Sequence, residues 1–341
     1  MLELAQSQRL AGEQVIVFSA GTEQKRAEHH NVTIRYLEGS RMEFAMNFVR
    51  DVTPLSPHVI HVHNRAEIAW LSRAAGLGPT ILSCDYHLEP WHRFPCRGLS
   101  KRVWRRCLFA CDRIAPVSRY CSQLYASYWS IPQSKLAEIP NGVDCRRFRP
   151  DNALRSAWRT RLGVGSVPVI LYVGRLCRQK GSDLLIEAYR QLKSQAVLVM
   201  AGPCEQFGRD QTSSLVSDLQ EAGGIYLPPL EDDELPGLYN ACDLFAMPTR
   251  ELEMFGMAAV EAQACGKPVV ASDHGGLQET VPDTAGVRFE AGSAADLAMR
   301  LEQLLGSDRP LETLAAGARE NALRYDWPIV AERCRAVYES L

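Results

Sequence analysis

The sequence lacks the long apolar segments and cysteine patterns that mark several classes of protein. No apolar run approaches the ~18–20 residues that span a bilayer, and residues 1–14 read as an amphipathic helix rather than a leader. The 11 cysteines contain no CxxC pair and no zinc-ligand spacing. An odd number of thiols without a leader fits a reducing compartment. We therefore expect a cytoplasmic protein with reduced cysteines.

Several catalytic signatures are also missing. The chain has no Walker loop, no GxGxxG after a predicted strand and no GxSxG elbow, so kinase-like, dinucleotide-fingerprint and serine-hydrolase interpretations have no support. No DxD occurs, which weakens any case for a carboxylate-held divalent metal. The sequence predicts neither a metal site nor a cofactor.

Lysine is scarce, with 6 residues against 32 arginines, and the charges are unevenly divided. Residues 1–150 hold 20 basic and 13 acidic residues, a net charge of +7, whereas residues 151–341 hold 18 and 27, a net charge of −9; together they give −2. The length fits about two domains. The asymmetry indicates that these domains have different partners.

Short apolar runs alternate with helical segments in the second half of the chain. This alternation is typical of βαβ units around a buried parallel sheet, whose ligands bind beyond the carboxyl ends of the strands. The predicted strands are VPVILYVG (167–174), AVLVMAG (196–202), GIYL (224–227), DLFAMP (243–248) and KPVVAS (267–272). The predicted helices are 182–194, 208–222, 233–241, 256–265 and 294–305.

The first half repeats the pattern less regularly. A linker is expected at PNGVDCRRFRP (140–150), where proline and glycine bracket a turn. The pattern therefore predicts two α/β domains with a cleft between them. The predicted strands of this half are 14–20, 32–38, 58–63, 79–84 and 113–118.

The segment VGRLCRQKG (173–181) follows a predicted strand and precedes a helix. A turn at Gly174, the fork of Arg175 and the point charge of Lys180 suit a diphosphate. A surface loop with solvated cations is the alternative that spacing alone leaves open.

Two carboxylates, Glu253 and Glu261, lie eight residues apart around the start of a predicted helix. Eight residues make just over two helical turns, so both can meet one ligand, beside the free amides of Phe255, Gly256 and Met257. Carboxylates accept hydrogen bonds from sugar hydroxyls. The alternative is that these are solvated charges favoured by the helix dipole.

Four segments together resemble a known family. PNGVDCRRF (140–148), VGRLCRQKG (173–181), EMFGMAAVE (253–261) and ACGKPVVASDHGGLQE (264–279) match, in order and spacing, the GT-B retaining glycosyltransferases of the glycosyl transferases group 1 family (family 4). The resemblance covers about residues 110–341. It implies two Rossmann-like domains facing across a cleft. Residues 1–145, completed by a helix at 327–341, would form the acceptor side, and residues 146–326 would bind the nucleotide sugar.

The resemblance also implies roles for individual residues. Arg175 and Lys180, in the loop that turns at Gly174, would bind the donor diphosphate and support the leaving nucleotide. Glu261 would hold the ribose hydroxyls, and Glu253 would lie beside the transferred sugar. The remaining donor contacts are assigned to the amides of Phe255, Gly256 and Met257, and to Leu227 and Pro228 where the nucleobase packs. The family needs no metal.

Two departures from the family pattern concern the first half. The usual first strand and its glycine-rich loop are missing, because residues 3–11 already read as the first helix and 14–20 as the second strand. Loss of that central strand would open the sheet, and we expect an in-frame upstream extension that encodes it. In LSCDYHLEPWH (82–92), Asp85 stands where the family has a histidine, so Asp85 and His87 are jointly assigned to the cleft.

The segment 93–119 carries eight basic residues and one acidic residue, with Trp104, Leu108 and Phe109 interleaved. A basic amphipathic helix can lie on an anionic leaflet or receive a phosphate-bearing acceptor. A solvated cationic face is the alternative. Nucleic acid is a poorer partner for a slightly acidic chain without a binding signature.

These observations predict a retaining, metal-independent glycosyltransferase. It would move a hexose from a UDP- or GDP-sugar to a glycan, a lipid-linked acceptor or a small hydroxylated acceptor, in the cytoplasm or on the inner face of the membrane. A catalytically silent paralogue that binds nucleotide sugar is the alternative, and a nucleotide-sugar epimerase of the same fold is a weaker one. Turnover with acceptor separates them.

Overall fold

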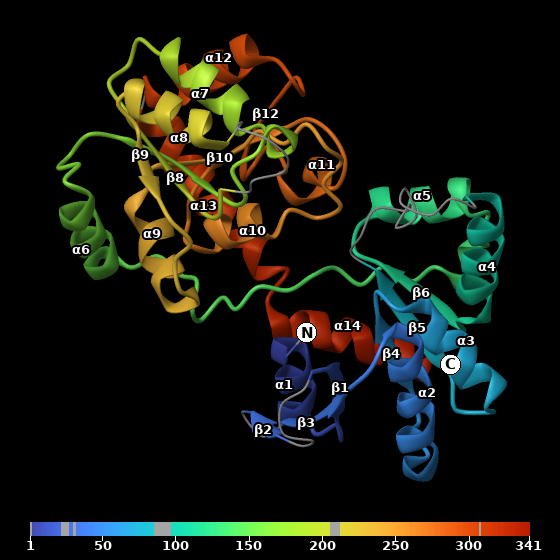
Figure 1. Cartoon of the computed structure of the whole chain (residues 1–341). Coiled ribbons are helices and arrows are strands. Elements are labelled where there is room, and N and C mark those ends of the chain that lie inside the picture. Colours follow the sequence, from blue (N-terminus) through green and yellow to red (C-terminus); the bar gives the residue numbers. More distant parts are fainter. Residues whose placement is uncertain (1, 22–26, 30–31, 85–96, 205–211, 307) are drawn as a thin grey trace. The chain divides into compact units, whose positions relative to one another are not determined.

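The computed structural model describes residues 2–21, 27–29, 32–84, 97–204, 212–306 and 308–341. The chain divides into two compact units, one made of Met1–Gly142 with Trp327–Leu341 and the other of Val143–Asp326 (Figure 1). We describe each unit separately.

The Val143–Asp326 unit is built on a six-stranded sheet in which every neighbouring pair is parallel. Its strand order is β12-β11-β10-β7-β8-β9, so the chain crosses over helices between strands. Most of its strand residues are fully buried, as expected for a sheet covered on both faces. The strands are β7 (Val169–Val173), β8 (Val197–Ala201), β9 (Ile225–Leu227), β10 (Leu244–Met247), β11 (Val269–Ser272) and β12 (Gly286–Phe289).

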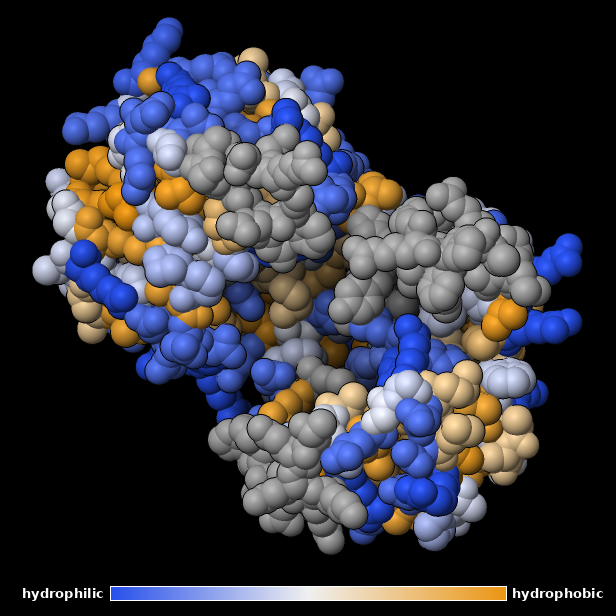
Figure 2. Space-filling view, in the orientation of Figure 1, coloured by the Kyte–Doolittle hydropathy of each residue, from blue (hydrophilic) through white to orange (hydrophobic). Residues whose placement is uncertain are grey.

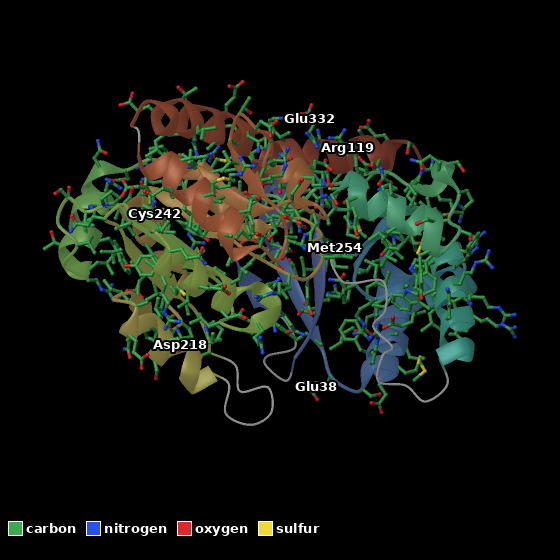
Figure 3. The ribbon with its side chains drawn as sticks, turned by 90° about the horizontal axis from the view of Figure 1, so that it is seen from above. Glu38, Arg119, Asp218, Cys242, Met254 and Glu332 are labelled. Atoms are coloured by element: carbon green, nitrogen blue, oxygen red, sulfur yellow. The ribbon has the colours of Figure 1, made fainter. Side chains whose placement is uncertain are left out.

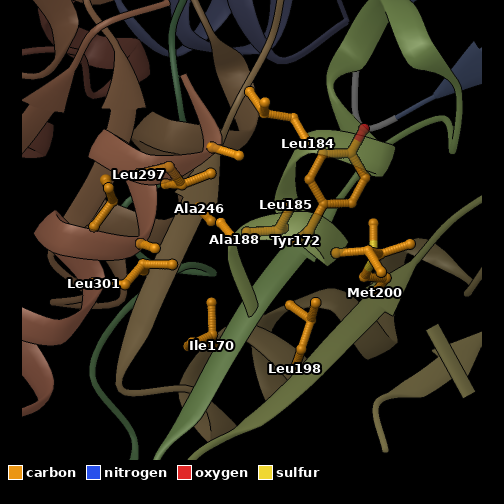
Figure 4. Packing of buried hydrophobic residues seen from close by; sticks show 14 of the residues in the cluster. Ile170, Tyr172, Leu184, Leu185, Ala188, Leu198, Met200, Ala246, Leu297 and Leu301 are labelled. Carbon is orange, nitrogen blue, oxygen red and sulfur yellow. The ribbon is translucent and has the colours of Figure 1, made fainter. Parts of the chain in front are cut away.

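Helices cover both faces of this sheet. On one face, α7 and α12 pack against the strands and close a large core, in which Leu184, Leu198 and Leu297 are at most 2% exposed (Figure 4). Their apolar residues recur at helical spacing, which places them on one side of each helix. The helices of the unit are α6 (Asn152–Leu162), α7 (Ser182–Arg190), α8 (Thr212–Glu221), α9 (Leu235–Ala241), α10 (Met257–Ala264), α11 (Leu277–Thr280), α12 (Ala294–Leu305) and α13 (Asp308–Leu323).

The predicted strands and helices of this half all appear, shorter at their ends by up to four residues. Strand β12 and helices α6, α11 and α13 were not predicted. The run GVRF of β12 is too short and too polar to stand out, and it is specified by its pairing with β11. Helix α13 places Leu311 and Leu314, three residues apart, against the core, a helical spacing that the prediction overlooked.

The other unit contains two separate three-stranded sheets. In one, β3 pairs in parallel with β1 and antiparallel with β2; in the other, β5 pairs in parallel with β4 and β6. Among the described residues, no strand joins these two sheets to each other. The strands are β1 (Ile16–Ala20), β2 (Ala27–His29), β3 (Val32–Leu37), β4 (Ile60–His63), β5 (Thr80–Cys84) and β6 (Arg113–Pro116).

The first and last helices of the chain pack together in this unit. Leu4 of α1 (Leu2–Leu10) and Val330 of α14 (Trp327–Glu339) share a buried cluster with Ile81 of β5. The hydroxyl of Tyr338 accepts a hydrogen bond from Gln8 at 2.9 Å and lies 2.7 Å from His61 Nδ1. Burial holds the pKa of His61 well below its ordinary value, so this histidine is neutral.

Four further helices complete the unit: α2 (Arg41–Val52), α3 (Ala66–Ala74), α4 (Arg97–Ala110) and α5 (Arg119–Tyr128). None of the helices in the described ranges is long and apolar enough to cross a membrane. Hydrophilic residues dominate the face shown in Figure 2, with apolar residues in small patches between them.

Candidate functional site

The candidate site lies at the carboxyl edge of the six-stranded sheet. Strands β11, β10, β7 and β8 are neighbours and run in the same direction, so the loops that follow them emerge side by side. These loops carry the motif residues: 174–181 follows β7, 248–256 follows β10 and 273–276 follows β11.

Glycines allow two of these loops to touch through their backbones. A Cβ atom at Gly181 (φ +73°) would lie 1.8 Å from the carbonyl oxygen of Pro248. A Cβ atom at Gly202 (φ +136°) would lie 2.1 Å from the carbonyl oxygen of Gly174. Both positions combine a left-handed backbone with a close approach, so only glycine fits without displacement. The loops after β7, β8 and β10 are therefore fixed against one another.

The loop after β11 supports the segment that bears Glu253. The amide of Gly276 donates a 2.7 Å hydrogen bond to the carbonyl oxygen of Glu253. A Cβ atom at Gly275 would lie 2.5 Å from that same oxygen. Met254, labelled in Figure 3, is 5% exposed and anchors the segment in the interior.

The structure brings Lys180 and Glu253 together. Their Nζ and Oε2 atoms are 2.8 Å apart, and the two side chains are 27% and 20% exposed. Arg175 lies in the same loop as Lys180, half-buried, and its carbonyl oxygen accepts a 2.7 Å hydrogen bond from the hydroxyl of Tyr172. Tyr172 is itself buried in the core shown in Figure 4, so the loop is tied to the sheet beneath it.

Helix α10 begins at the same edge. Gly256 is its N-cap, with φ +91°, and no side chain caps the first turn. Within the first turn the amide of Ala259 donates to the carbonyl oxygen of Gly256 at 3.0 Å, and binding of a ligand by the amide of Met257 stays a prediction. Predicted donor residues Phe255 and Gly256 are both buried.

A buried polar network fixes the turn before α10. The hydroxyl of Thr280 donates a 2.8 Å hydrogen bond to the carbonyl oxygen of Phe255. The carbonyl oxygen of Thr280 in turn accepts hydrogen bonds from Gln263 at 2.9 Å and Asn321 at 3.0 Å. Because all three polar side chains are at most 4% exposed, the turn is part of the interior.

Glu261 lies one turn further along α10 and is held by Tyr239 of α9. The hydroxyl of Tyr239 donates a 2.7 Å hydrogen bond to Glu261 Oε2. Burial raises the pKa of Glu261 to about 7, against the opposing effects of Tyr239 and Arg147. Burial also raises the pKa of Tyr239 well above its ordinary value, so its hydroxyl is a donor at all physiological pH values.

The two residues assigned to the nucleobase lie at the end of β9. Leu227 is half-buried, and its carbonyl oxygen accepts a 3.1 Å hydrogen bond from the amide of Gly202. Pro228 is exposed beside it. Asp85 and His87 fall outside the described residues. Among the residues that are described, no group of three or more His, Cys, Asp or Glu side chains could hold a metal ion.

Sequence reasoning missed Tyr239 and Thr280. Tyr239 lies in a short apolar helix, where a tyrosine reads as an ordinary core residue. Thr280 follows the GGLQE run, and nothing in that run indicates that its hydroxyl reaches back 25 residues to Phe255. Both act through contacts between elements distant in sequence, which residue spacing cannot report.

Comparison with known proteins gives matches over both units. Residues 155–322 match the family model described as glycosyl transferases group 1, and residues 1–147 match the one described as glycosyltransferase family 4. A D-inositol 3-phosphate glycosyltransferase of Catenulispora acidiphila is 36% identical over 245 residues, which cover 68% of this chain and 58% of that protein.

A second relative is the GDP-mannose-dependent alpha-(1-6)-phosphatidylinositol monomannoside mannosyltransferase of Mycolicibacterium smegmatis. It is 31% identical over 271 residues, covering 75% of this chain and 69% of that protein. Among solved structures, sucrose-phosphate synthase from Thermosynechococcus elongatus has a TM-score of 0.84 at 21% identity, over 99% of this chain and 91% of that one.

Anabaena Alr3699/HepE in complex with UDP and glucose gives a TM-score of 0.82 at 22% identity, over 100% of this chain and 95% of that one. At this level of identity the likeness concerns the fold. It confirms the predicted α/β architecture.

Proposed function

Because this chain belongs to the glycosyl transferases group 1 family of glycosyltransferases, we propose that it moves a hexose from a nucleotide-diphosphate sugar to a hydroxylated acceptor with retention of configuration. The observation that carries the proposal is the meeting of Lys180, Glu253 and the start of α10 at one edge of the sheet. A diphosphate would be bound by the Lys180 ammonium group and by the amides at the start of α10. A sugar would donate hydroxyl hydrogen bonds to the Glu253 carboxylate.

In the proposed reaction, the bond between the anomeric carbon and the diphosphate oxygen breaks while the acceptor oxygen bonds to the same face of that carbon. The acceptor proton passes to the departing phosphate oxygen. Negative charge grows on the leaving group, where Arg175, Lys180 and the first amides of α10 are assigned to stabilise it. Fixed donors of this kind act without reorganising during the step.

The proposal includes independence from divalent metal. Two cationic side chains and a helix N-terminus supply positive charge where a metal clamp would otherwise be required. Activity is therefore expected to persist in excess EDTA. Complete loss, restored by Mg²⁺ or Mn²⁺, would contradict the assignment of the phosphate contacts to Arg175 and Lys180.

The donor and acceptor are proposed as classes. A UDP- or GDP-sugar would fit the proposed diphosphate and ribose contacts. The relative that depends on GDP-mannose supports a GDP-sugar. The acceptor is a glycan, a lipid-linked molecule or a small hydroxylated compound. The relative named for an inositol phosphate supports a small hydroxylated acceptor. The relative named for a phosphatidylinositol mannoside supports a lipid-linked acceptor.

Peripheral contact with a membrane is also proposed, through the outer face of α4. Lys101, Arg102 and Arg106 are exposed there, whereas Trp104 and Leu108 are buried in the unit. The predicted interleaving of basic and apolar residues therefore does not produce an apolar face for a leaflet. The attraction is electrostatic, toward anionic lipid headgroups.

The decisive experiment has two stages. Calorimetry with GDP, UDP and ADP tests the donor site, and nucleotide release from the matching sugar nucleotides, with and without acceptor, tests turnover. Release that depends on acceptor supports the transferase. Nucleotide binding without release would support a silent paralogue, and a changed free sugar without acceptor would support an epimerase.

A further inference from the structure

The phenol of Tyr239 is held in one place by the core. Its ring is fully buried, and the rings of Phe148 and Phe245 lie 5.8 and 5.6 Å away, centre to centre. Packing on two sides leaves the hydroxyl a single direction, toward Glu261 Oε2 at 2.7 Å. Tyr239 therefore determines which way this carboxylate faces.

The described residues engage a single oxygen of Glu261. In the described part of the chain, Oε2 accepts from Tyr239 and no hydrogen bond reaches Oε1. An ionised carboxylate accepts several hydrogen bonds, so Oε1 keeps its capacity for ligand hydroxyls. Glu261 is partly exposed, so part of the residue can meet a bound molecule.

The charge of Glu261 is finely balanced. The Tyr239 hydroxyl from α9 and the Arg147 guanidinium favour its ionised form, and the negative charge of Asp232 opposes it. Burial raises the pKa of the nearby Cys265 thiol, just after α10, to about 12, so that group is neutral. Arg147 donates a hydrogen bond to the carbonyl oxygen of Asp232, so the guanidinium is itself held in position. Burial opposes ionisation.

We propose that Tyr239 is a positioning residue for donor binding, which favours the ionised form of Glu261 and turns its second oxygen toward the ribose hydroxyls of the nucleotide. This inference rests on the proposed function, because it takes the ribose as the ligand of Glu261. It adds that the strength of nucleotide binding depends on a phenol that does not touch the nucleotide.

The proposal predicts a dependence on pH with a definite sign. With the pKa of Glu261 at about 7, nucleotide affinity rises as the pH increases through neutrality, because the carboxylate accepts ribose hydrogen bonds better when ionised. Tyr239→Phe removes a donor that stabilises the charged form. The pKa of Glu261 then increases, and the rise in affinity shifts to higher pH by about one unit. One pKa unit is a tenfold change in the ionisation equilibrium, which is about what one hydrogen bond to a charged group contributes.

The test is calorimetry from pH 5.5 to 9 with whichever of GDP, UDP or ADP binds the unaltered protein. Tyr189→Phe is the matched control, since its hydroxyl donates to the carbonyl oxygen of Ala196 at 3.0 Å, in a loop before β8. Glu261→Gln identifies the titrating group. In Glu261→Gln, any pH dependence that remains near pH 6 comes from the terminal phosphate of the nucleotide, which titrates there.

We expect a shifted profile for Tyr239→Phe, an unshifted one for Tyr189→Phe and loss of the step near pH 7 for Glu261→Gln. Donor KM rises in Tyr239→Phe while kcat changes little. A uniform loss at every pH, or an unshifted step, would overturn the proposal. Tyr239→Met, which fills the cavity without a donor, makes the same test if Tyr239→Phe does not fold. If no nucleotide binds the unaltered protein, the proposed function itself has failed.

Discussion

Lys180 Nζ lies 2.8 Å from Glu253 Oε2, so the cation assigned to the diphosphate and the carboxylate assigned to the sugar form an ion pair with each other. Under the proposed function, a diphosphate would compete with Glu253 for this lysine, and its binding would release Glu253 toward the sugar. The ion pair would then couple the binding of the two ends of the donor.

This coupling predicts that Glu253→Gln binds free nucleoside diphosphate more tightly, by about fivefold, because a partly exposed ion pair is worth on the order of 1 kcal/mol. Turnover should fall, since the sugar loses its carboxylate. Calorimetry and steady-state kinetics measure the two effects. Glu187→Gln, an exposed substitution on α7 with the same change in charge, should do neither. Unchanged or weaker nucleotide binding in Glu253→Gln would mean that the pair does not restrain the lysine.

Lys180→Met should weaken donor use in a different manner. It removes charge-assisted hydrogen bonds worth roughly 1.5–3 kcal/mol, or about 10–150-fold in kcat/KM. Because charge on the leaving group grows during the reaction, kcat should fall as well as KM rise. The control is Arg178→Gln, whose side chain is 71% exposed two residues away. A loss confined to KM would assign Lys180 to ground-state binding alone.

Gly181→Ala tests the close packing of the site loops. The new Cβ would lie 1.8 Å from the Pro248 oxygen, so the two loops must separate, and both stability and nucleotide affinity should decrease. Gly223→Ala is the control, because Gly223 has a similar φ of +84° but no atom within 4 Å. It should cost about 1 kcal/mol of backbone strain and leave nucleotide affinity intact. Thermal unfolding with and without nucleotide distinguishes them, and equal losses would refute the role of the contact.

The outer face of α4 predicts binding to anionic vesicles. Replacing both Arg102 and Arg106 by Gln should weaken sedimentation with phosphatidylglycerol vesicles on the order of 30-fold, at about 1 kcal/mol for each basic residue. Arg50→Gln, whose side chain is 71% exposed and paired with Asp51, should have little effect. If the unaltered protein binds phosphatidylglycerol no better than phosphatidylcholine, the membrane proposal is wrong.

The α/β architecture was accessible from the sequence because buried parallel strands are short apolar runs that can be recognised without their partners, and the GT-B assignment came from the family resemblance. The runs that became β7 and β10 illustrate this, since every residue of each is apolar or aromatic. The membership of the family followed from the combined motifs. Strand β12 was missed because its identity depends on hydrogen bonds to β11 rather than on its own composition.

The site was accessible in part. Motif spacing placed Lys180 and Glu253 on loops at the same sheet edge, but not their direct contact across 73 residues. Motif spacing could not reveal the role of Tyr239 either. A buried tyrosine has the same apolar sequence neighbours whether or not its hydroxyl donates a hydrogen bond to a carboxylate. The roles of the individual donor residues stay predictions, and Asp85 and His87 lie beyond the described part of the chain.

The Thr280, Gln263 and Asn321 network has a consequence for the timescale on which the site moves. Opening the turn at Phe255 would leave buried polar groups without partners, at roughly 1–3 kcal/mol each. The amides of Ala259 and Val260 donate to the carbonyl oxygen of Gly256 beside this network, so they should exchange with solvent more slowly than amides without a hydrogen-bond partner. This network would make the turn before α10 a rigid side of the proposed donor site.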